Sequence, residues 1–209
     1  MDSPQRRLEE IFTHFPGIGP RQAKRFIYHL ISRSPKAIKE FVDLVTEVKK
    51  STTECLTCHR YFFTKDITAS TPTVCAICKD TSRDATTIVV VSRDSDFEAI
   101  EKSGAYKGLY FVLGGVVPIL DKDPEKRIRL QALLERLSME VNLSEIILSL
   151  NTTPEGEHTT TIVKDAISHI YASKEHKPKI TILGRGLSTG AELEYADGET
   201  IKNAIRNRG

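Results

Sequence analysis

The beginning of the chain carries apolar residues at the three- and four-residue spacing of amphipathic helices. Three such segments follow one another, with apolar faces formed by Leu8, Ile11, Phe12 and Phe15, then by Ala23, Phe26, Ile27 and Leu30, and then by Ile38, Phe41, Val45 and Val48. Ser3-Pro4 and Ser34-Pro35 each place a capping residue before a first-turn proline. The stretch "PGIGP" ends the first segment, and Pro20 begins the second. The pattern predicts a helical region over residues 1–53.

The later part of the chain switches to short runs rich in β-branched residues. These runs are "TTIVVV" (86–91), "GLYFVLG" (108–114), "EIILSLN" (145–151) and "KITILG" (179–184). Helical patterns alternate with them, among them 124–140 and 159–171. Continuous apolar strands that alternate with helices are typical of a parallel sheet with helices on both faces. The sequence therefore predicts an α/β domain over 81–184, followed over 185–209 by a glycine-rich loop and a short basic helix or tail.

Composition and charge narrow the possible classes of protein. The chain has 209 residues, of which 39% are hydrophobic, and this is enough for a packed core. The chain has 30 basic and 28 acidic residues, so its formal net charge is only +2. A nucleic-acid site would therefore have to arise from local clustering of positive charge. No apolar run approaches the roughly 20 residues of a membrane helix, and "MDSPQRRLEE" lacks an apolar signal core. We therefore expect a cytoplasmic protein with no membrane partner.

The turn between the first two predicted helices combines backbone freedom with positive charge. Gly17 and Gly19 permit a tight turn and a close approach of a ligand to the backbone, and Pro20 suits the first helical position. The helix that follows adds three cations within five residues, Arg21, Lys24 and Arg25. Unpaired N–H groups at a helix start attract anions, so a phosphate backbone would satisfy this set without base recognition. The alternative is a helix corner with a solvated basic face.

Four cysteines form two C-x-x-C pairs separated by sixteen residues. They are Cys55, Cys58, Cys75 and Cys78. In a reducing compartment such pairs indicate a metal site rather than disulfides, and four thiolates match the closed tetrahedral shell of structural Zn²⁺. A closed shell leaves no position for a substrate, so we assign no catalysis to the metal. Buried or redox-active cysteines are the alternative, and His59 is a possible substitute ligand.

Acidic residues follow two of the predicted strands. The first loop carries Asp94, Asp96, Glu98 and Glu101, and the loop "LNTTPEGEHT" carries Glu155 and Glu157. Because ligands gather at the carboxyl ends of parallel strands, the two loops are candidates for one Mg²⁺ site. The alternative interpretation is that these carboxylates cap helix N-termini, where the helix dipole stabilises them.

In their order along the chain, these motifs resemble the RecR family of bacterial recombination mediators. The resemblance covers "FPGIGPRQAKR", the four cysteines, "VVVSRDSDFEAIE", "GLYFVLGG", "NTTPEGEHT" and "RGLSTGAELEYADGETI". It implies a helix-hairpin-helix region over 1–53, a zinc finger over 54–80, a Toprim domain over 81–184, and a C-terminal loop and helix over 185–209.

The resemblance also implies a function and assigns residues to it. Family members form dimeric or tetrameric rings that can encircle DNA, and they work with RecO and RecF to load RecA onto gapped DNA coated by single-strand-binding protein. By position, the resemblance implies DNA binding by Arg21 and Arg25, zinc binding by the four cysteines, and partner contact by Glu155 and Glu157. No catalytic residue is implied.

Two other functions stay open at this point. A Mg²⁺-dependent Toprim nuclease or primase needs a glutamate after the first sheet strand, but this chain has Ser92 there. The later loop offers Asn151 and Glu155 where such an enzyme has a D-x-D pair. A protein-interaction module would use zinc only for stability and would reach DNA through its partners. Ser92 favours the non-catalytic, DNA-binding function.

Overall fold

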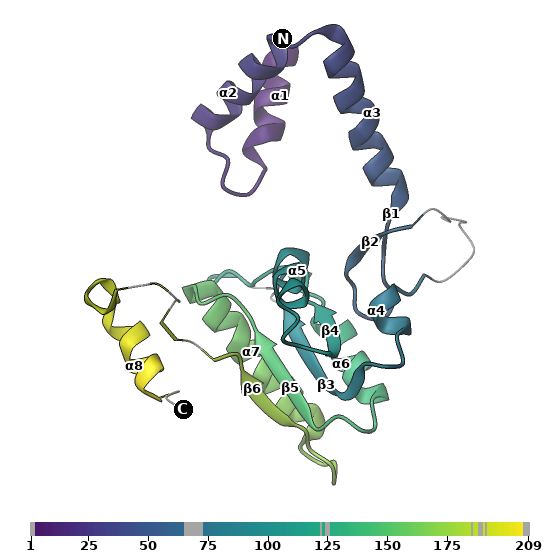
Figure 1. The fold of residues 1–209 in the computed structure, drawn as a ribbon, viewed down its shortest axis with the longest axis vertical. Helices are drawn as coiled ribbons and strands as arrows, with labels where there is room; N and C mark the ends of the chain where they lie inside the picture. The colour runs from purple at the N-terminus through teal and green to yellow at the C-terminus, as the bar shows by residue number, and fades with distance from the viewer. Residues whose placement is uncertain are drawn as a thin grey trace. The chain divides into compact units, whose positions relative to one another are not determined.

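The protein is described from a computed structural model that covers residues 3–64, 73–121, 123, 126–184, 186–187, 190 and 192–206. These residues form two compact units (Figure 1). One unit comprises the residues up to 52 with Phe63 and Thr64, and the other comprises residues 53–62 and those from 73 onward. Within the described ranges, none of the helices combines the length and apolar character needed to cross a membrane.

The first unit consists of three helices, α1 (Pro4–Thr13), α2 (Pro20–Ile31) and α3 (Pro35–Ser51). Each begins at the proline that the sequence pattern indicated. The Ser3 hydroxyl accepts the N–H of Arg6 and the Ser34 hydroxyl accepts that of Ala37, both at 3.3 Å, so the two predicted caps are present. Helices α1 and α2 form a hairpin in which Phe12 meets Phe26 edge to face, with ring centroids 5.8 Å apart.

Much of the apolar surface of this unit is exposed. Among its described residues, Ala23 and Ile27 are the two that are buried, and both lie on α2. Helix α3 buries none of its side chains. Its apolar residues lie on one helical face and stay about half exposed; we call them the α3 stripe, which consists of Phe41, Leu44, Val45 and Val48. An amphipathic helix with an uncovered apolar face lacks a packing partner within its own unit.

The second unit is built on a four-stranded parallel sheet in the order β4-β3-β5-β6. Its strands are β3 (Asp84–Val91), β4 (Gly108–Val112), β5 (Glu145–Ser149) and β6 (Lys179–Ile182), and they confirm the four runs expected from the sequence. Val89 on β3 pairs with Tyr110 on β4 and with Ile147 on β5. A two-stranded sheet of β1 (Thr52–Glu54) and β2 (Tyr61–Phe63) precedes it along the chain.

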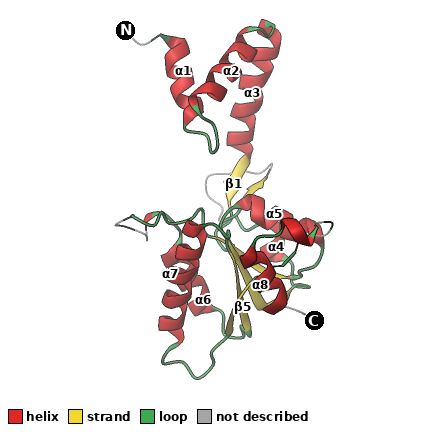
Figure 2. Cartoon of the chain, turned by 90° about the vertical axis from the view of Figure 1, so that its left-hand side faces the viewer, coloured by secondary structure: helices red, strands yellow, loops and turns green. Residues whose placement is uncertain are grey.

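Helices cover both faces of the parallel sheet (Figure 2). Helices α6 (Leu130–Met139) and α7 (Pro154–Tyr171) pack on the face that carries Ile88 and Val90. Helix α5 (Asp94–Ser103) packs on the face that carries Val89 and Val91, where Ile77 of the short helix α4 (Ala76–Lys79) joins it. Because both faces of β3 are buried, its sequence is apolar without alternation. The predicted α/β architecture is confirmed.

Two predicted helix boundaries are wrong. The helix expected over 124–140 begins only at Leu130; residues 122, 124 and 125 lie outside the described part. Charged residues form a turn just before it, since Arg127 Nε bonds the Asp121 carboxylate at 2.6 Å. The helix expected over 159–171 begins earlier, at Pro154, because the Thr153 hydroxyl accepts the N–H of Gly156 at 3.2 Å.

The C-terminal part of the unit contains a 3₁₀ turn, Leu193–Tyr195, and helix α8 (Gly198–Arg206). Asp197 caps α8, because its carboxylate accepts the N–H of Thr200 at 2.9 Å and the hydroxyl of Thr200 at 2.7 Å. The short C-terminal helix predicted from the sequence is therefore present.

Gly156, in the first turn of α7, packs so closely against the backbone that it leaves no room for a side chain. A Cβ at this position would overlap the backbone carbonyl of Asn151, which no rotamer change can relieve. We expect Gly156→Ala to lower the free energy of unfolding by at least about 2 kcal/mol, measured by urea denaturation. Gly198→Ala is the matched control, because a Cβ there meets open space, and it should change stability by less than about 0.5 kcal/mol. Equal stabilities of the two variants would contradict this packing.

Candidate nucleic-acid interface and metal site

The hairpin between α1 and α2 uses its two glycines differently. Gly17 has a φ of 76°, a left-handed conformation that favours glycine, whereas Gly19 is extended and caps α2. The N–H of Gly19 donates to the Gln22 side chain at 2.9 Å. Pro20 has no N–H, so within the described structure the open donors of the helix start are the backbone N–H groups of Arg21 and Gln22. The anion site expected here is thus limited to two N–H groups.

The three cations of α2 are not equivalent. Arg21 and Arg25 are four residues apart, so their side chains are neighbours on the helix surface. Both are exposed, on the side of α2 opposite the buried Ala23 and Ile27. Lys24 instead lies near α1, with its Nζ 3.7 Å from the Glu9 carboxylate. The structure therefore leaves the two arginines better placed than Lys24 to meet an external anion.

The basic face of α2 is longer than sequence reasoning assumed. At the same four-residue spacing, it continues from Arg25 to His29 and then to Arg33 just beyond the helix. The Arg33 guanidinium contacts His29 Nε2 through Nε at 3.1 Å and through Nη2 at 3.0 Å. Helical periodicity was the signal that could have found both residues, because the motif "GIGPRQAKR" ends before them.

The four cysteines converge on one point. Their Sγ atoms all lie within 4.8 Å of one another; Cys55, Cys58 and Cys75 are buried and Cys78 is partly buried. Cys55 Sγ accepts backbone N–H groups from Thr57 at 3.4 Å and from Cys75 at 3.3 Å. Sulfurs that converge and accept N–H groups in this way fit a tetrahedral, thiolate-bound metal ion.

Crowding of the sulfurs affects their protonation in the metal-free protein. Hydrogen bonds from Cys58, Cys75 and Cys78 lower the pKa of Cys55. The Cys58 thiol donates a hydrogen bond to Cys55, and because this bond needs the Cys58 proton, it raises the pKa of Cys58. All four thiols can ionise together only when a cation compensates their charge, so metal binding must release protons.

His59 does not belong to the group of metal-binding atoms. That group contains only the four cysteines among the described residues. The Nδ1 of His59 instead bonds the Glu54 carboxylate at 2.6 Å, and its ring packs against Phe111 with centroids 5.1 Å apart. The alternative in which His59 replaces a cysteine is not supported.

The residue that follows β3 is buried. Ser92 follows this strand, is fully buried, and its hydroxyl finds no hydrogen-bond partner among the described residues. The loop after β4 covers it, since Gly114 donates its N–H to the Ser92 carbonyl at 3.0 Å. Val117, further along this loop, donates its N–H to the Thr159 hydroxyl at 2.8 Å. A metal at this strand end would have no carboxylate from position 92.

The acidic residues after β3 have local roles. Asp94 accepts the N–H of Tyr61 at 2.7 Å, and Asp96 accepts that of Arg93 at 2.9 Å. Glu101 pairs with Arg83 and accepts the Tyr110 hydroxyl at 2.8 Å. The Asp96 contact supports the capping interpretation, and the contacts of Asp94 and Glu101 show that these two carboxylates serve neighbouring groups rather than a common metal site.

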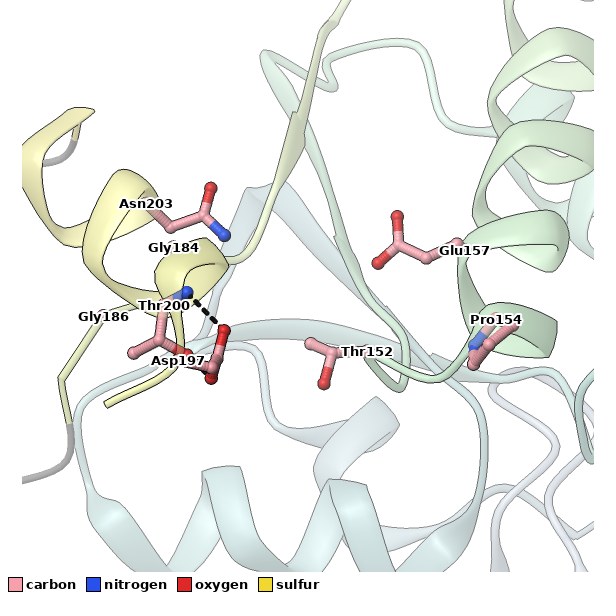
Figure 3. A pocket seen from close by; sticks show the side chains of 8 residues that line it. All are labelled: Thr152, Pro154, Glu157, Gly184, Gly186, Asp197, Thr200 and Asn203. Atoms are coloured by element: carbon pink, nitrogen blue, oxygen red, sulfur yellow. Dashed lines mark hydrogen bonds between the residues drawn. The ribbon is translucent and has the colours of Figure 1, made fainter. Parts of the chain in front are cut away.

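Glu155 and Glu157 lie in the first turn of α7 and not in a loop. Both side chains are exposed. Glu157 lines a cavity of about 640 Å³ that also involves Thr152 before α7, Gly184 after β6, and Thr200 on α8 (Figure 3). Its carboxylate points toward α8, whereas Glu155 is not part of the cavity wall. The two residues thus present charge in different directions.

Comparisons with known proteins cover almost the whole chain. A family model described as "Toprim domain" matches residues 86–183, and one described as "RecR, C-terminal" matches residues 186–208. The Recombination protein RecR of Lactobacillus johnsonii is 35% identical over 208 residues, which are 98% of this chain and 96% of that protein. The Recombination protein RecR of Staphylococcus aureus is 37% identical over 208 residues with the same coverage.

Proposed function

Because the chain belongs to the RecR family of recombination proteins, we propose that it is a non-catalytic, DNA-binding subunit of recombinational DNA repair. Together with RecO- and RecF-type proteins, it would help to load RecA onto gapped DNA in the cytoplasm. The DNA contact would ignore base sequence, because the groups offered by the hairpin recognise phosphate.

The observation that carries DNA binding is the placement of Arg21 and Arg25. Both side chains are exposed on the face of α2 opposite its buried residues, and Arg21 lies in the first turn, which carries the open N–H groups. Gly17 and Gly19 add no side chain on either side of Ile18, so a phosphate can approach the backbone at these two positions. Lys24 adds long-range charge, reduced by its proximity to Glu9.

We assign structural Zn²⁺ to the four cysteines. Four thiolates form a closed shell in which Zn²⁺ cross-links the two C-x-x-C pairs and stabilises their fold. The cysteines would hold the ion, and none of them would touch DNA or a substrate.

The proposal excludes catalysis because of Ser92. A Toprim enzyme would need an ionised glutamate at this position, in reach of Mg²⁺ and substrate. Ser92 offers only a buried hydroxyl beneath the loop after β4. Asp94, Asp96 and Glu101 of α5 are engaged with neighbouring groups, so these three do not replace the missing carboxylate.

The exposed apolar surface of the first unit supports a homo-oligomer. Besides the α3 stripe, this unit has an apolar hollow of about 490 Å³, lined by Phe12, Phe15, Phe26, Leu30 and Phe41 among others. Apolar patches of this kind mark protein interfaces. A second copy of the chain supplies a matching apolar face, as a dimer or tetramer ring requires.

The α3 stripe can be tested by introducing a charge. We expect Val45→Glu to shift the protein from an oligomer to a monomer in sedimentation velocity experiments, because burial of an unpaired carboxylate in the interface costs several kcal/mol. The control is Thr46→Glu, which adds the same charge to the polar side of α3 and should leave the oligomer intact. Identical sedimentation of Val45→Glu and the unmodified chain would exclude this surface as the interface.

Glu155 and Glu157 are proposed to contact a partner protein. Both are exposed and negative, and they extend from different sides of the first turn of α7, so the surface of a RecO-type partner that meets either of them should be basic. A carboxylate in the first turn of α7 is also stabilised by the helix dipole, which keeps it ionised.

The whole function can be tested by reconstitution. The assay contains RecO, RecA and gapped DNA coated by single-strand-binding protein, and RecA ATP hydrolysis reports filament formation. We expect addition of the chain to accelerate filament formation at least about tenfold. The chain alone, with Mg²⁺, should leave the DNA intact. No acceleration, or metal-dependent cleavage that Glu155→Ala abolishes, would overturn the proposed function.

A further inference from the structure

The cysteine pairs and the parallel sheet are joined by direct hydrogen bonds. Strand β4 lies at one edge of the sheet, and its last residue, Val112, donates its N–H to the carbonyl of Cys58 at 2.8 Å. The next residue, His59, has a φ of 60°, which is unusual for a residue other than glycine. In this conformation the His59 ring packs against Phe111 of β4. The first C-x-x-C pair thus ends against the edge of the sheet.

Glu54 links this contact to a second segment. Its Oε1 lies 2.6 Å from His59 Nδ1 and 3.2 Å from Arg129 Nε. Arg129 immediately precedes α6, and its backbone N–H donates to the Leu113 carbonyl at 2.8 Å. Its Nη1 donates to the Val112 carbonyl at 3.3 Å and lies close to Gly114, where a Cβ would overlap it. One guanidinium therefore contacts both Glu54, one residue before Cys55, and the loop after β4.

The loop after β4 continues the connection to α7. Val117 donates its N–H to the Thr159 hydroxyl at 2.8 Å, and that hydroxyl donates to the carbonyl of Glu155 at 2.7 Å. Val117 and Thr159 are fully buried, so neither bond can be exchanged for one to water without local opening. A continuous set of contacts leads from the cysteines to the turn that carries Glu155 and Glu157.

We propose that Arg129 couples the metal site to the first turn of α7, so that metal binding orders the turn that presents Glu155 and Glu157. The role of this turn in partner contact rests on the proposed function, but the coupling itself does not. Without the metal, the two C-x-x-C pairs lose their cross-link, and the carbonyl of Cys58 is no longer fixed against Val112. Glu54, one residue before Cys55, then holds Arg129 less firmly, and Arg129 holds the loop less firmly.

The coupling can be measured by amide hydrogen exchange of the full chain. Exchange is followed by NMR for the protein loaded with Zn²⁺ and for the protein after chelation. We expect the N–H groups of Val112 and Val117 to exchange at least about tenfold faster without the metal. Exchange at the sheet centre, at Ile147 of β5, should change far less, because no bond in the set reaches it. Equal exchange of Val117 in both states would overturn the proposal.

A substitution at Arg129 separates coupling from general destabilisation. Arg129→Met keeps the four cysteines and should still bind one Zn²⁺ per chain, checked by metal content. In this variant, Val112 should still respond to chelation, whereas Val117 should exchange fast in both states. A Val117 response as large as in the unmodified chain would refute the role of Arg129. Arg127→Met is the matched control, since Arg127 is exposed and bonds only Asp121 among the described contacts, and it should retain the full response.

A second variant tests the last link. Thr159→Val keeps the volume of the side chain but removes the hydroxyl that joins Val117 to Glu155. We expect the N–H groups of the first turn of α7 to lose their response to chelation, while Val112 keeps its response. If Arg129→Met fails to fold, this variant and the chelation experiment still decide whether the metal site is coupled to the first turn of α7. DNA binding enters none of these measurements, so failure of the DNA-binding function would be seen separately.

Discussion

Replacing Arg21 and Arg25 together with alanine is expected to weaken DNA binding about 10- to 100-fold per hairpin at physiological salt. Each arginine can neutralise one phosphate, and the counterions released by two contacts account for an effect of this size. The slope of log K against log salt should become shallower by roughly two for each hairpin engaged. Fluorescence anisotropy with a labelled oligonucleotide, repeated across a salt series, measures both quantities.

The control for this experiment must remove the same charge elsewhere. Lys164 on α7 and Lys177 before β6 are exposed, and Lys164→Ala/Lys177→Ala lowers the net charge by the same amount. This double variant should retain nearly all of the affinity and the full salt slope. If the two double variants bind DNA equally, attraction by total charge explains binding and the hairpin is not the site. Lys24→Ala alone should have a smaller effect than either arginine, because Glu9 already competes for that ammonium group.

Loss of one cysteine is expected to have the largest effect on stability. Cys58→Ser removes a buried sulfur from the four-sulfur group, so the metal content should fall from one Zn²⁺ per chain to almost none. Because a structural zinc site contributes its binding energy to folding, we expect the melting temperature of the second unit to fall by roughly 10 °C. Calorimetry and elemental analysis test both parts. The affinity of the unmodified site should rise with pH, since the metal displaces thiol protons.

Thr57→Ala is a control within the same C-x-x-C pair. The Thr57 backbone N–H bonds Cys55, and this bond does not depend on the side chain that the substitution removes. The variant should keep its zinc and its melting temperature within about 2 °C. Full zinc content in Cys58→Ser, or an unchanged melting temperature, would show that the four cysteines do not form a structural zinc site.

The sheet and the starts of α1, α2 and α3 could be predicted from local sequence. Ile88 to Val91 are apolar without a break because both faces of β3 are covered, and this pattern survives in any compact arrangement. The serine-proline pairs fixed two helix starts to the residue. Such signals are strong because each depends on a few neighbouring residues and on backbone hydrogen bonds that must be satisfied.

The errors arose where tertiary contacts override local pattern. Pro154 was expected in a loop, but Thr153 caps a helix there and Gly156 packs against Asn151 in a way that only glycine permits. The helical pattern over 124–140 placed Arg129 inside a helix. In the structure Arg129 ends the turn before α6, and it pairs with Glu54, which lies far away in sequence. A contact between two such residues has no periodicity, so no pattern in the sequence indicates it.

The candidate site shows the same division. The convergence of the four cysteines followed from their spacing, because each C-x-x-C pair is itself a local chelate. The unequal roles of Arg21 and Lys24 did not, because Glu9 lies on a different helix. Likewise, residue type alone placed Glu155 and Glu157 together, whereas the geometry of α7 directs only Glu157 into the cavity.

The burial of Ser92 limits how this protein can change over generations. A single substitution of Ser92 by glutamate would place a carboxylate where neither solvent nor a partner group can reach it, at a cost of several kcal/mol. The loss of stability from this substitution would outweigh any benefit of a new metal ligand. Metal-dependent chemistry at this strand end would require the loop Leu113–Val117 to open as well. The packing above β3 therefore disfavours the gain of a metal ligand at this strand end by one substitution alone.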